Sequence, residues 1–110
     1  MTCRSIDATT VTLEDTPLDR AQVIDGDPAV AAAALLEAPG LEVGVWEHTA
    51  GTSTDIEADE VFVVLGGRAT VTIEDGPSLE LRAGSVGFLD AGARTTWTVH
   101  ETLRKVYVLR

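Results

Sequence analysis

Glu60 is the residue best placed for chemistry, because it is a lone acid at the start of the apolar run Val61–Leu65. A carboxylate beside apolar side chains must be solvated, paired or protonated, since isolated burial of its charge is prohibitive. One structural explanation is an ion pair with Arg94, Arg104 or Lys105, and another is the capping of a turn. The functional alternative is a general acid or base, or an anchor for an amine-bearing ligand.

Arg94 and three acids near Glu60 are the other charged residues considered for a site. Arg94 follows a glycine-containing turn, so its guanidinium is either an ion-pair partner or an anchor for an anionic ligand at the rim of a pocket. Asp55, Glu57 and Asp59 lie in a polar stretch before Glu60, and we interpret them as a solvated acidic loop.

The stretch 59–76 is the element that must position Glu60. Its first half is apolar at successive positions, which indicates a strand covered on both faces, as in a sandwich or closed barrel. The glycine pair at 66–67 allows a sharp bend, and the alternation of apolar and polar residues over 69–74 predicts that the strand then resumes. The Asp-Gly pair at the end of the stretch is a hairpin-turn signal.

The rest of the chain consists of short β-prone segments separated by turns that contain Gly, Pro or Asp. Short strands at a spacing of roughly 8–12 residues are typical of a sandwich or small barrel. Besides the stretch 59–76, we predict strands over 29–36, 41–48, 79–81, 86–89, 95–99 and 103–109, and a short edge strand over 9–13. The polar segment 49–59 is predicted to be a loop.

The alanine-rich segment 29–36 shows neither a helical nor a strand period. Its propensity alone favours a helix, but the segments on both sides behave as β structure, and tertiary context routinely overrides propensity. We therefore predict a strand here, with a helix as the alternative.

Length and composition indicate a single-domain protein from a reducing compartment. The 110 residues suffice for one hydrophobic core. Cys3 is the single cysteine, so no internal disulfide can form. No apolar run approaches the length of a bilayer span, which is about 20 residues, and none resembles a signal peptide. A formal net charge of -10 would repel a phosphate backbone. We expect a cytoplasmic protein with neither nucleic acid nor a membrane as its partner.

A series of ordered motifs between residues 29 and 109 resembles the small single-domain cupins. The motifs are Gly44–Glu47, Thr49–Gly51, Asp59–Glu60, Leu65–Gly67, Ala83–Ser85, Ala91–Gly92, Trp97–Val99 and Arg104–Val108. Within the cupins they are most similar to the DUF861 type, which is grouped with ethanolamine-utilisation cupins and with the cupin part of (S)-ureidoglycine aminohydrolase.

The resemblance implies an all-β fold, the cupin jelly-roll β-barrel (an RmlC-like double-stranded β-helix), with a pocket inside the barrel. It divides the chain into an N-terminal arm with a short edge strand, residues 1–28, and a cupin domain, residues 29–110. It also implies a homodimer, for which the aliphatic segment 106–109 is a candidate pairing edge.

The metal-ligand set of the family is depleted in this chain. Metal-binding cupins hold a divalent transition metal with three histidines and one glutamate, and Glu60 occupies the glutamate position. The first two histidine positions fall, depending on the spacing chosen, on Thr54 and Ile56 or on Ser53 and Asp55. Thr95 replaces the third histidine. We therefore expect no cofactor, with a divalent transition metal as the alternative.

Two histidines are present, and each has a structural explanation. His100 alternates out of phase with Trp97, so we predict it on the outer, solvated face. His48 ends its strand and is interpreted as a histidine at the rim of the pocket. The alternative is that His48 joins Glu60, with Asp55 as a further ligand, in a substitute metal site.

The family's ligand positions point into the barrel, which implies a pocket with aromatic walls and one carboxylate. The expected ligand-binding residues are Trp46, His48, Phe62, Arg94, Thr95 and Trp97, and Glu60 is the candidate catalytic residue. For the three aromatic residues the alternative is simple packing in the core.

The depleted ligand set favours a cupin that binds a small polar metabolite, with or without catalysis. The first alternative is a metal-dependent enzyme, for which the family suggests aminohydrolase-like chemistry on a small nitrogen-containing metabolite. The second is a structural or regulatory cupin whose pocket is vestigial.

Overall fold

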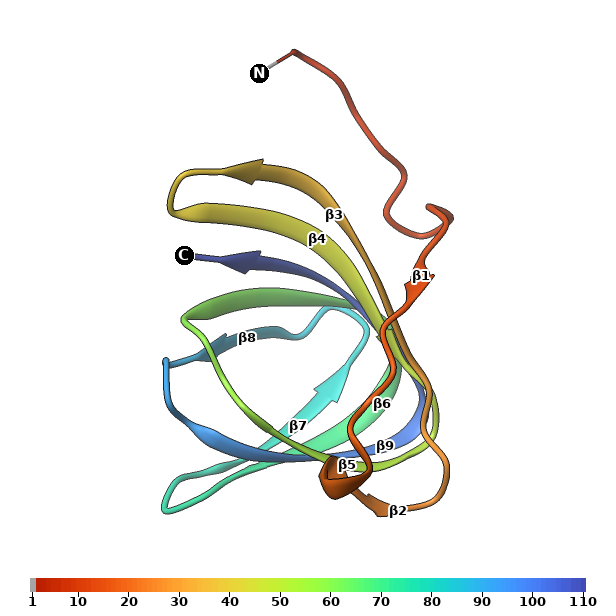
Figure 1. Ribbon diagram of the computed structural model, residues 1–110, viewed down its shortest axis with the longest axis vertical. Helices are drawn as coiled ribbons and strands as arrows, with labels where there is room; N and C mark the ends of the chain where they lie inside the picture. The colour runs from red at the N-terminus through yellow and green to blue at the C-terminus, as the bar shows by residue number, and fades with distance from the viewer. Residues whose placement is uncertain (1) are drawn as a thin grey trace.

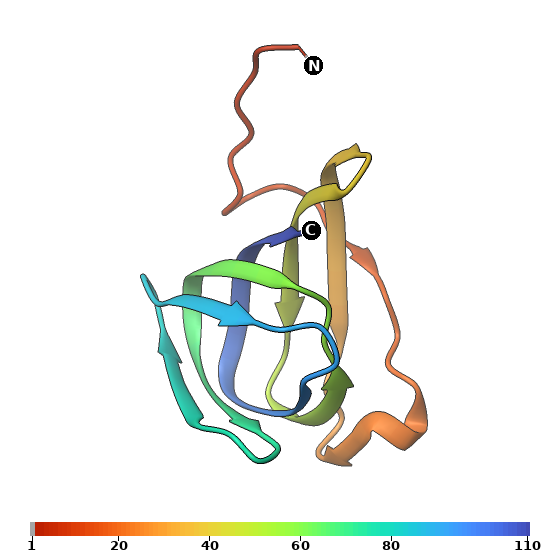
Figure 2. The same ribbon diagram turned by 90° about the vertical axis from the view of Figure 1, so that its left-hand side faces the viewer.

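A computed structural model describes residues 2–110 (Figure 1). These residues form a nine-stranded sheet that curls around an interior, as two views at right angles show (Figures 1 and 2). The elements are β1 (Glu14–Asp15), the 3-10 turn η1 (Arg20–Gln22), β2 (Val23–Asp25), β3 (Val30–Ala38), β4 (Leu41–His48), β5 (Gly51–Ile56), β6 (Glu60–Ile73), β7 (Ser78–Arg82), β8 (Val86–Leu89) and β9 (Arg94–Leu109). The predicted all-β jelly-roll barrel is confirmed.

The long strands β6 and β9 form the centre of the barrel. β9 pairs antiparallel with β5 through its first half, with β4 through its second half, and with β6 along most of its length. The inward-facing apolar side chains of these strands make up most of the core, which consists of Phe62, Val64, Ala69, Val71, Leu81, Leu89, Trp97, Val99, Leu103 and Tyr107. Burial of this apolar surface is the main stabilising term of the fold.

The glycine pair at 66–67 produces the bend that its sequence predicts. Gly67 has a φ of +90°, and a Cβ atom at this position would overlap the Thr102 carbonyl oxygen. The pairing register with β9 shifts on both sides of Gly66, yet β6 continues through the bend to Ile73. Asp75 has a φ of 59° in the turn that leads to β7, as expected for a hairpin.

Several predicted element boundaries are wrong. The segments 95–99 and 103–109 are parts of one strand, β9, and the predicted loop 49–59 contains β5. The edge strand of the N-terminal arm is β1, at Glu14–Asp15, rather than 9–13. The segment 106–109 is paired with β4 on one side and β6 on the other, so it is not a free edge at which a second chain could add a strand.

The alanine-rich segment is a strand, as predicted. β3 pairs with β4 over nearly its whole length, with Ala32 opposite Trp46. Ala32 lines the interior beside that indole, and a small side chain there leaves room for the ring. The pairing of β3 with β4 therefore overrides the helix propensity of alanine.

The N-terminal arm is fastened to the outer face of the barrel. Arg104 donates from Nε to the Ala8 carbonyl oxygen over 3.0 Å and from Nη2 to the Val11 carbonyl oxygen over 2.7 Å, and its Nη1 donates to Glu47. Residues 2–110 contain no helix of the length and apolarity that crossing a membrane requires.

Candidate functional site

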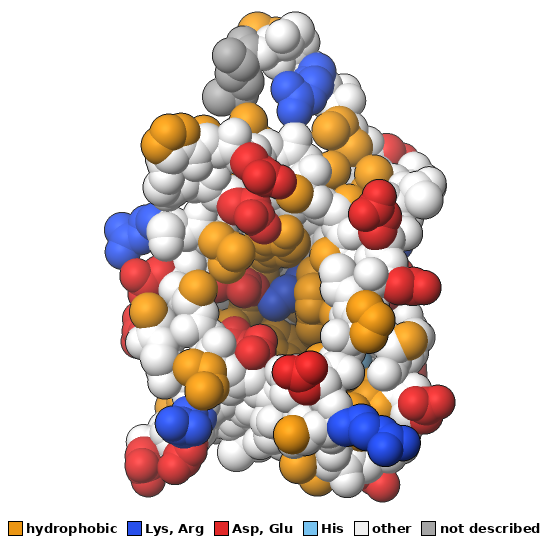
Figure 3. All heavy atoms as spheres, in the orientation of Figure 1, with side chains coloured by type: hydrophobic (Ala, Val, Ile, Leu, Met, Phe, Trp, Pro, Cys, Tyr) orange, Lys and Arg blue, Asp and Glu red, His pale blue; other side chains and the backbone are white. Residues whose placement is uncertain are grey.

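A cavity of about 200 Å³ opens on the inner side of the curled sheet (Figure 3). Its lining comes from strands on several sides of the barrel and consists of Leu18, Val30, Ala32, Glu42, Trp46, Ser53, Thr54, Asp55, Glu57, Glu60, Trp97, Lys105, Tyr107 and Leu109. The space-filling view shows acidic side chains around the hollow and a basic group within it (Figure 3). Apolar walls with a few polar groups are typical of small-molecule sites.

The ammonium group of Lys105 is held among three aromatic rings. Its Nζ lies 4.5 Å from the ring centroid of Trp46, 4.6 Å from that of Phe62 and 4.5 Å from that of Trp97. These distances lie within the about 6 Å over which an aromatic face attracts a cation, and the attraction is strongest where water is excluded. We call this arrangement the aromatic cage. The cavity therefore carries a cation of its own.

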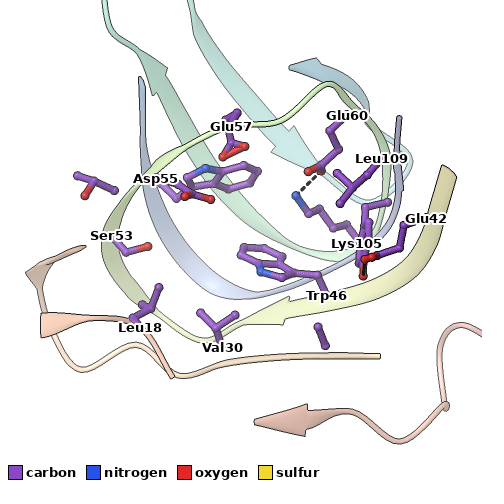
Figure 4. A pocket seen from close by; sticks show the side chains of 14 residues that line it. Leu18, Val30, Glu42, Trp46, Ser53, Asp55, Glu57, Glu60, Lys105 and Leu109 are labelled. Atoms are coloured by element: carbon purple, nitrogen blue, oxygen red, sulfur yellow. Dashed lines mark hydrogen bonds and ion pairs between the residues drawn. The ribbon is translucent and has the colours of Figure 1, made fainter. Parts of the chain in front are cut away.

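Glu60 pairs with this cation. Lys105 Nζ donates to Glu60 Oε2 over 2.6 Å, and the two side chains are only 5% and 10% exposed. Figure 4 shows Glu60 and Lys105 pointing toward each other at one side of the cavity. Of the other two cations considered as partners, Arg104 bonds to Glu47 and Arg94 is exposed at the start of β9. The structural explanation of Glu60 as one half of an ion pair is therefore correct, and its partner is Lys105.

Glu57 is a second buried acid, so its assignment to a solvated loop is wrong. The side chain lines the cavity and is 8% exposed. Thr95 Oγ1 donates to Glu57 Oε1 over 3.2 Å, and the same hydroxyl accepts a hydrogen bond from Trp97 Nε1 over 3.1 Å. Burial, followed by the neighbouring charge of Asp55, raises the pKa of Glu57 to about 7. This carboxyl can therefore give or take a proton near neutral pH.

The raised pKa of Glu57 predicts a pH-dependent contribution to stability. Because this pKa is about 7 in the folded chain against an ordinary value of 4.5, the folded state holds the proton more tightly than the unfolded state. The stabilising contribution is complete below pH 4.5 and is lost as the pH rises to about 7. The free energy of unfolding of the wild type, minus that of Glu57→Gln, should therefore fall by on the order of 3 kcal/mol between these limits. Urea unfolding of both proteins across this pH range measures the difference, and a flat difference would contradict it.

His48 is buried behind Trp46, so the expected position at the rim is wrong. Its side chain has no exposed surface, and its ring centroid lies 5.4 Å from that of Trp46. Nδ1 donates to the Thr49 carbonyl oxygen over 2.6 Å, and Nε2 accepts from Ser53 Oγ over 2.8 Å. Burial, with a smaller contribution from the charge of Lys105, lowers the pKa of His48. The imidazole is therefore neutral, and both of its nitrogens are occupied.

Removal of the Ser53 hydroxyl should destabilise the fold by about 1–3 kcal/mol, because it leaves His48 Nε2 buried without a hydrogen-bond donor. The matched control is Ser78→Ala at the start of β7, where the serine is exposed and the cost should stay within about 0.5 kcal/mol. Urea unfolding compares the two variants. Equal stabilities would show that the Ser53–His48 hydrogen bond contributes nothing.

The residues at the family's metal-ligand positions do not fit a transition metal. Ser53 and Asp55 lie opposite Trp97 and Thr95 on the inner face, so they, rather than Thr54 and Ile56, hold the first two histidine positions. The four positions therefore hold a serine hydroxyl, the Asp55 carboxylate, a threonine hydroxyl and a glutamate already paired with an ammonium. Without an imidazole or a thiolate, this is a weak donor set for such a metal. Among residues 2–110, no group of three or more His, Cys, Asp or Glu side chains is arranged to hold a metal ion.

The structure brings together some of the expected ligand-binding residues and separates others. Trp46 and Trp97 line the cavity, whereas Phe62 lies in the core and reaches the site only as the third ring of the aromatic cage. Arg94 does not contribute to the cavity lining. His100 is exposed on the outer face, which confirms its predicted orientation.

Sequence reasoning missed two features of the cavity. The first is Lys105, considered above only as one of three ion-pair partners of Glu60. A usable signal was present, because the chain has seven arginines and a single lysine. By the period of two, that lysine shares a face of the last strand with the apolar residues Leu103 and Tyr107. The second is the hydrogen bond of 2.7 Å from Tyr107 Oη to Glu42 Oε2. Burial, and then this hydrogen bond, raise the pKa of Tyr107.

Comparison with known proteins places this chain among the cupins. The family model described as the EutQ-like cupin domain matches residues 37–107. Of the solved structures, the EutQ protein of Clostridium difficile matches with a TM-score of 0.74 and 23% identity, over 96% of this chain and 84% of that one. A predicted oxalate decarboxylase from Thermotoga maritima matches with a TM-score of 0.71 and 16% identity, over 96% and 97% of the two chains. At these identities the likeness shows the fold alone.

A DUF861-family protein of unknown function from Pseudomonas syringae matches with a TM-score of 0.77 and 27% identity. The match covers 96% of this chain but 46% of that protein, so this chain spans less than half of its length. A search of curated proteins finds no match. The family model covers well over half of the sequence, and this chain therefore belongs to the family of EutQ-like cupin domains.

Proposed function

We propose that the cavity binds a small polar organic molecule without the help of a metal ion. The observation that carries the proposal is the Lys105 ammonium, which the aromatic cage and Glu60 fix inside a cavity open to solvent. A fixed cation can orient the polar group of a ligand, which is the part of the work that a bound metal would otherwise do. The depleted set of metal ligands supports the same interpretation.

The walls of the cavity offer a ligand both apolar and polar contacts. Trp46 and Trp97 supply aromatic surface. Ser53, Asp55 and Glu57 supply polar groups from β5 and the segment that follows it, where Figure 4 shows the labelled side chains facing the cavity. The volume of about 200 Å³ is below the roughly 300–1,000 Å³ of pockets for drug-sized ligands. The ligand is therefore a small metabolite.

The two tryptophans make the cavity directly observable. They are the only tryptophans in the sequence and both line the cavity, so intrinsic fluorescence reports on this site alone. We expect at least one small amine, ureide or carboxylate to change the emission in a saturable way. Asp55→Asn should weaken the binding of an amine or a ureide at least about tenfold, because a charge-assisted hydrogen bond from the ligand N–H to the carboxylate contributes about 1.5–3 kcal/mol. Asp75→Asn, in the exposed β6–β7 turn, is the matched control. No response to any compound, or equal binding by both variants, would count against the proposal.

The alternative of a metal-dependent enzyme makes a different prediction. Protein prepared without chelator and without an affinity tag should contain far less than one equivalent of Mn, Fe, Ni or Zn, because the donors available at neutral pH are too few and too weak. Near-stoichiometric metal that is lost in Glu60→Gln would favour that alternative instead.

We also propose that the chain pairs with a second copy of itself. Val61 and Val63 on β6 lie opposite Phe88 and Val86 on β8, and all four side chains are exposed on the outer face, Phe88 by 70%. Two copies that each carry a net charge of -10 repel one another, so an uncharged patch is the surface through which they can approach. Light scattering should give a dimer for the wild type and a monomer for Phe88→Glu. An unchanged mass in Phe88→Glu, or a monomeric wild type, would rule out pairing through this patch.

A further inference from the structure

Lys105 also carries a potential nucleophile, a property that the binding proposal does not use. It is the only lysine in the sequence, it is 4% exposed, and its amine lines a cavity beside a carboxylate. Lysine is rarely buried, because its charge is costly to desolvate. A lysine amine can attack a carbonyl carbon once it has lost its proton, and an adjacent general base can accept that proton.

We propose that Lys105 Nζ forms an imine with a small uncharged or cationic aldehyde or ketone in the cavity. The inference rests on the proposed function, because it requires that small molecules enter this cavity. It goes further in naming the chemical class of the ligand and the atom to which the ligand becomes bound.

Glu60 is positioned to start the reaction. The ammonium must lose a proton before its nitrogen can attack, and Glu60 Oε2, at 2.6 Å from Nζ, accepts that proton. The nitrogen lone pair then forms a bond to the carbonyl carbon, and the carbonyl electron pair moves onto oxygen. Transfer of a proton from nitrogen to this oxygen gives a neutral carbinolamine.

The second half of the reaction expels water. The carbinolamine hydroxyl takes up a proton and leaves as water, while the nitrogen lone pair forms the carbon–nitrogen double bond of a cationic iminium. Glu57 lines the same cavity and can supply that proton, since its pKa is about 7. The proton that Glu60 accepted then replaces the one that Glu57 gave, so that both carboxyl groups return to their starting states. Counted over both halves, one ammonium and one carbonyl compound give one iminium and one water molecule, with no oxidant or reductant.

The surroundings of Nζ suit the product as well as the reactant. The iminium carries its positive charge at the nitrogen that the aromatic cage already surrounds at 4.5–4.6 Å, and Glu60 stays within reach as its counter-ion. The cage therefore stabilises the adduct by the same cation–π attraction that holds the free ammonium. A residue that only filled space would not need to keep a cation at this position.

The charge of the cavity decides which carbonyl compounds are accepted. Four carboxyl groups line it, those of Glu42, Asp55, Glu57 and Glu60, against the single ammonium of Lys105. A carbonyl compound that bears its own carboxylate meets net repulsion in this setting. Uncharged and cationic aldehydes and ketones are therefore preferred over oxo acids.

The single lysine makes the proposal open to a direct test by reductive trapping. The full chain is incubated with propanal or with glyoxylate in the presence of sodium cyanoborohydride, which converts an imine into a stable secondary amine, and peptide mapping by mass spectrometry locates the added mass. The matched control is Arg110→Lys, which places a second amine at an exposed position of the same molecule. We expect propanal to modify Lys105 at least about tenfold faster than the introduced lysine, because the cavity holds both reactants together. Glyoxylate should modify Lys105 more slowly than propanal does.

The outcomes separate this inference from the proposed function. Preferential labelling of Lys105 that slows in Glu60→Gln supports imine formation, provided that the variant retains the native circular dichroism spectrum. Labelling of the introduced lysine or the terminal amine at a rate equal to or above that of Lys105 overturns it. If tryptophan fluorescence meanwhile shows saturable binding of other small molecules, the imine is wrong and the binding function stands. If no compound of any class is bound or trapped, both are wrong.

Discussion

Lys105→Met should destabilise the fold by about 3–5 kcal/mol, because it leaves Glu60 with a buried charge and no partner. The replacement keeps an unbranched side chain of similar length, so the volume within the aromatic cage changes little. The loss comes from the ion pair of 2.6 Å and from the three ring contacts of the ammonium. Urea unfolding at pH 7 followed by circular dichroism measures it.

The double variant Lys105→Met with Glu60→Gln provides the control for that prediction. With the acid neutralised, no unpaired charge remains in the cavity, and the double variant should be more stable than Lys105→Met alone. If the second substitution instead lowers the stability further, the two residues do not act as a pair, and the loss in Lys105→Met comes from packing.

Gly67→Ala should destabilise the fold almost as strongly. Gly67 has a φ of +90°, a conformation that costs an L-residue about 1–2 kcal/mol. The added methyl group would also overlap the carbonyl of Thr102 in β9, and backbone shifts of this kind cost about 1–3 kcal/mol. The expected total is about 2–5 kcal/mol, and thermal or urea unfolding measures it.

Gly66→Ala is the matched control, since Gly66 has an ordinary φ and no atom lies within 4 Å of the position that the methyl group of an alanine would occupy. It should stay within about 1 kcal/mol of the wild type. Equal losses in the two variants would mean that the bend in β6 depends on the glycine pair as a whole, rather than on the close approach of Gly67 to β9.

Much of the fold was predictable because short strands with a period of two follow one another between turn residues. The alternation over 69–74 and the strands at 41–48 and 86–89 carry this signal in the sequence, and the structure matches it closely. The polar segment 49–59 concealed β5, since a strand that lines a cavity has polar side chains on its inner face. The segments 95–99 and 103–109 appeared as two strands because polar residues interrupt the apolar pattern within β9.

The candidate site was predictable only in part. Glu60 and the two tryptophans were found because they alternate with core residues or match a family motif. Glu57 was missed because its burial involves contacts with a distant strand, such as the hydrogen bond that Thr95 donates to it. No local sequence pattern indicates a contact of this kind. Lys105 was missed because it follows the same period-two pattern as the apolar residues on the inner face of β9. The pattern therefore did not distinguish it from them.

The position of the lysine amine tests the central claim most directly. Since the chain contains one lysine, protein labelled with carbon-13 on lysine gives a single set of side-chain NMR signals. Three aromatic rings within 4.6 Å of Nζ should displace the signals of the adjacent methylene protons far from their positions in the urea-unfolded chain. Signals at the same positions in the folded and unfolded chain would mean that the ammonium does not occupy the aromatic cage, and the proposed site would be wrong.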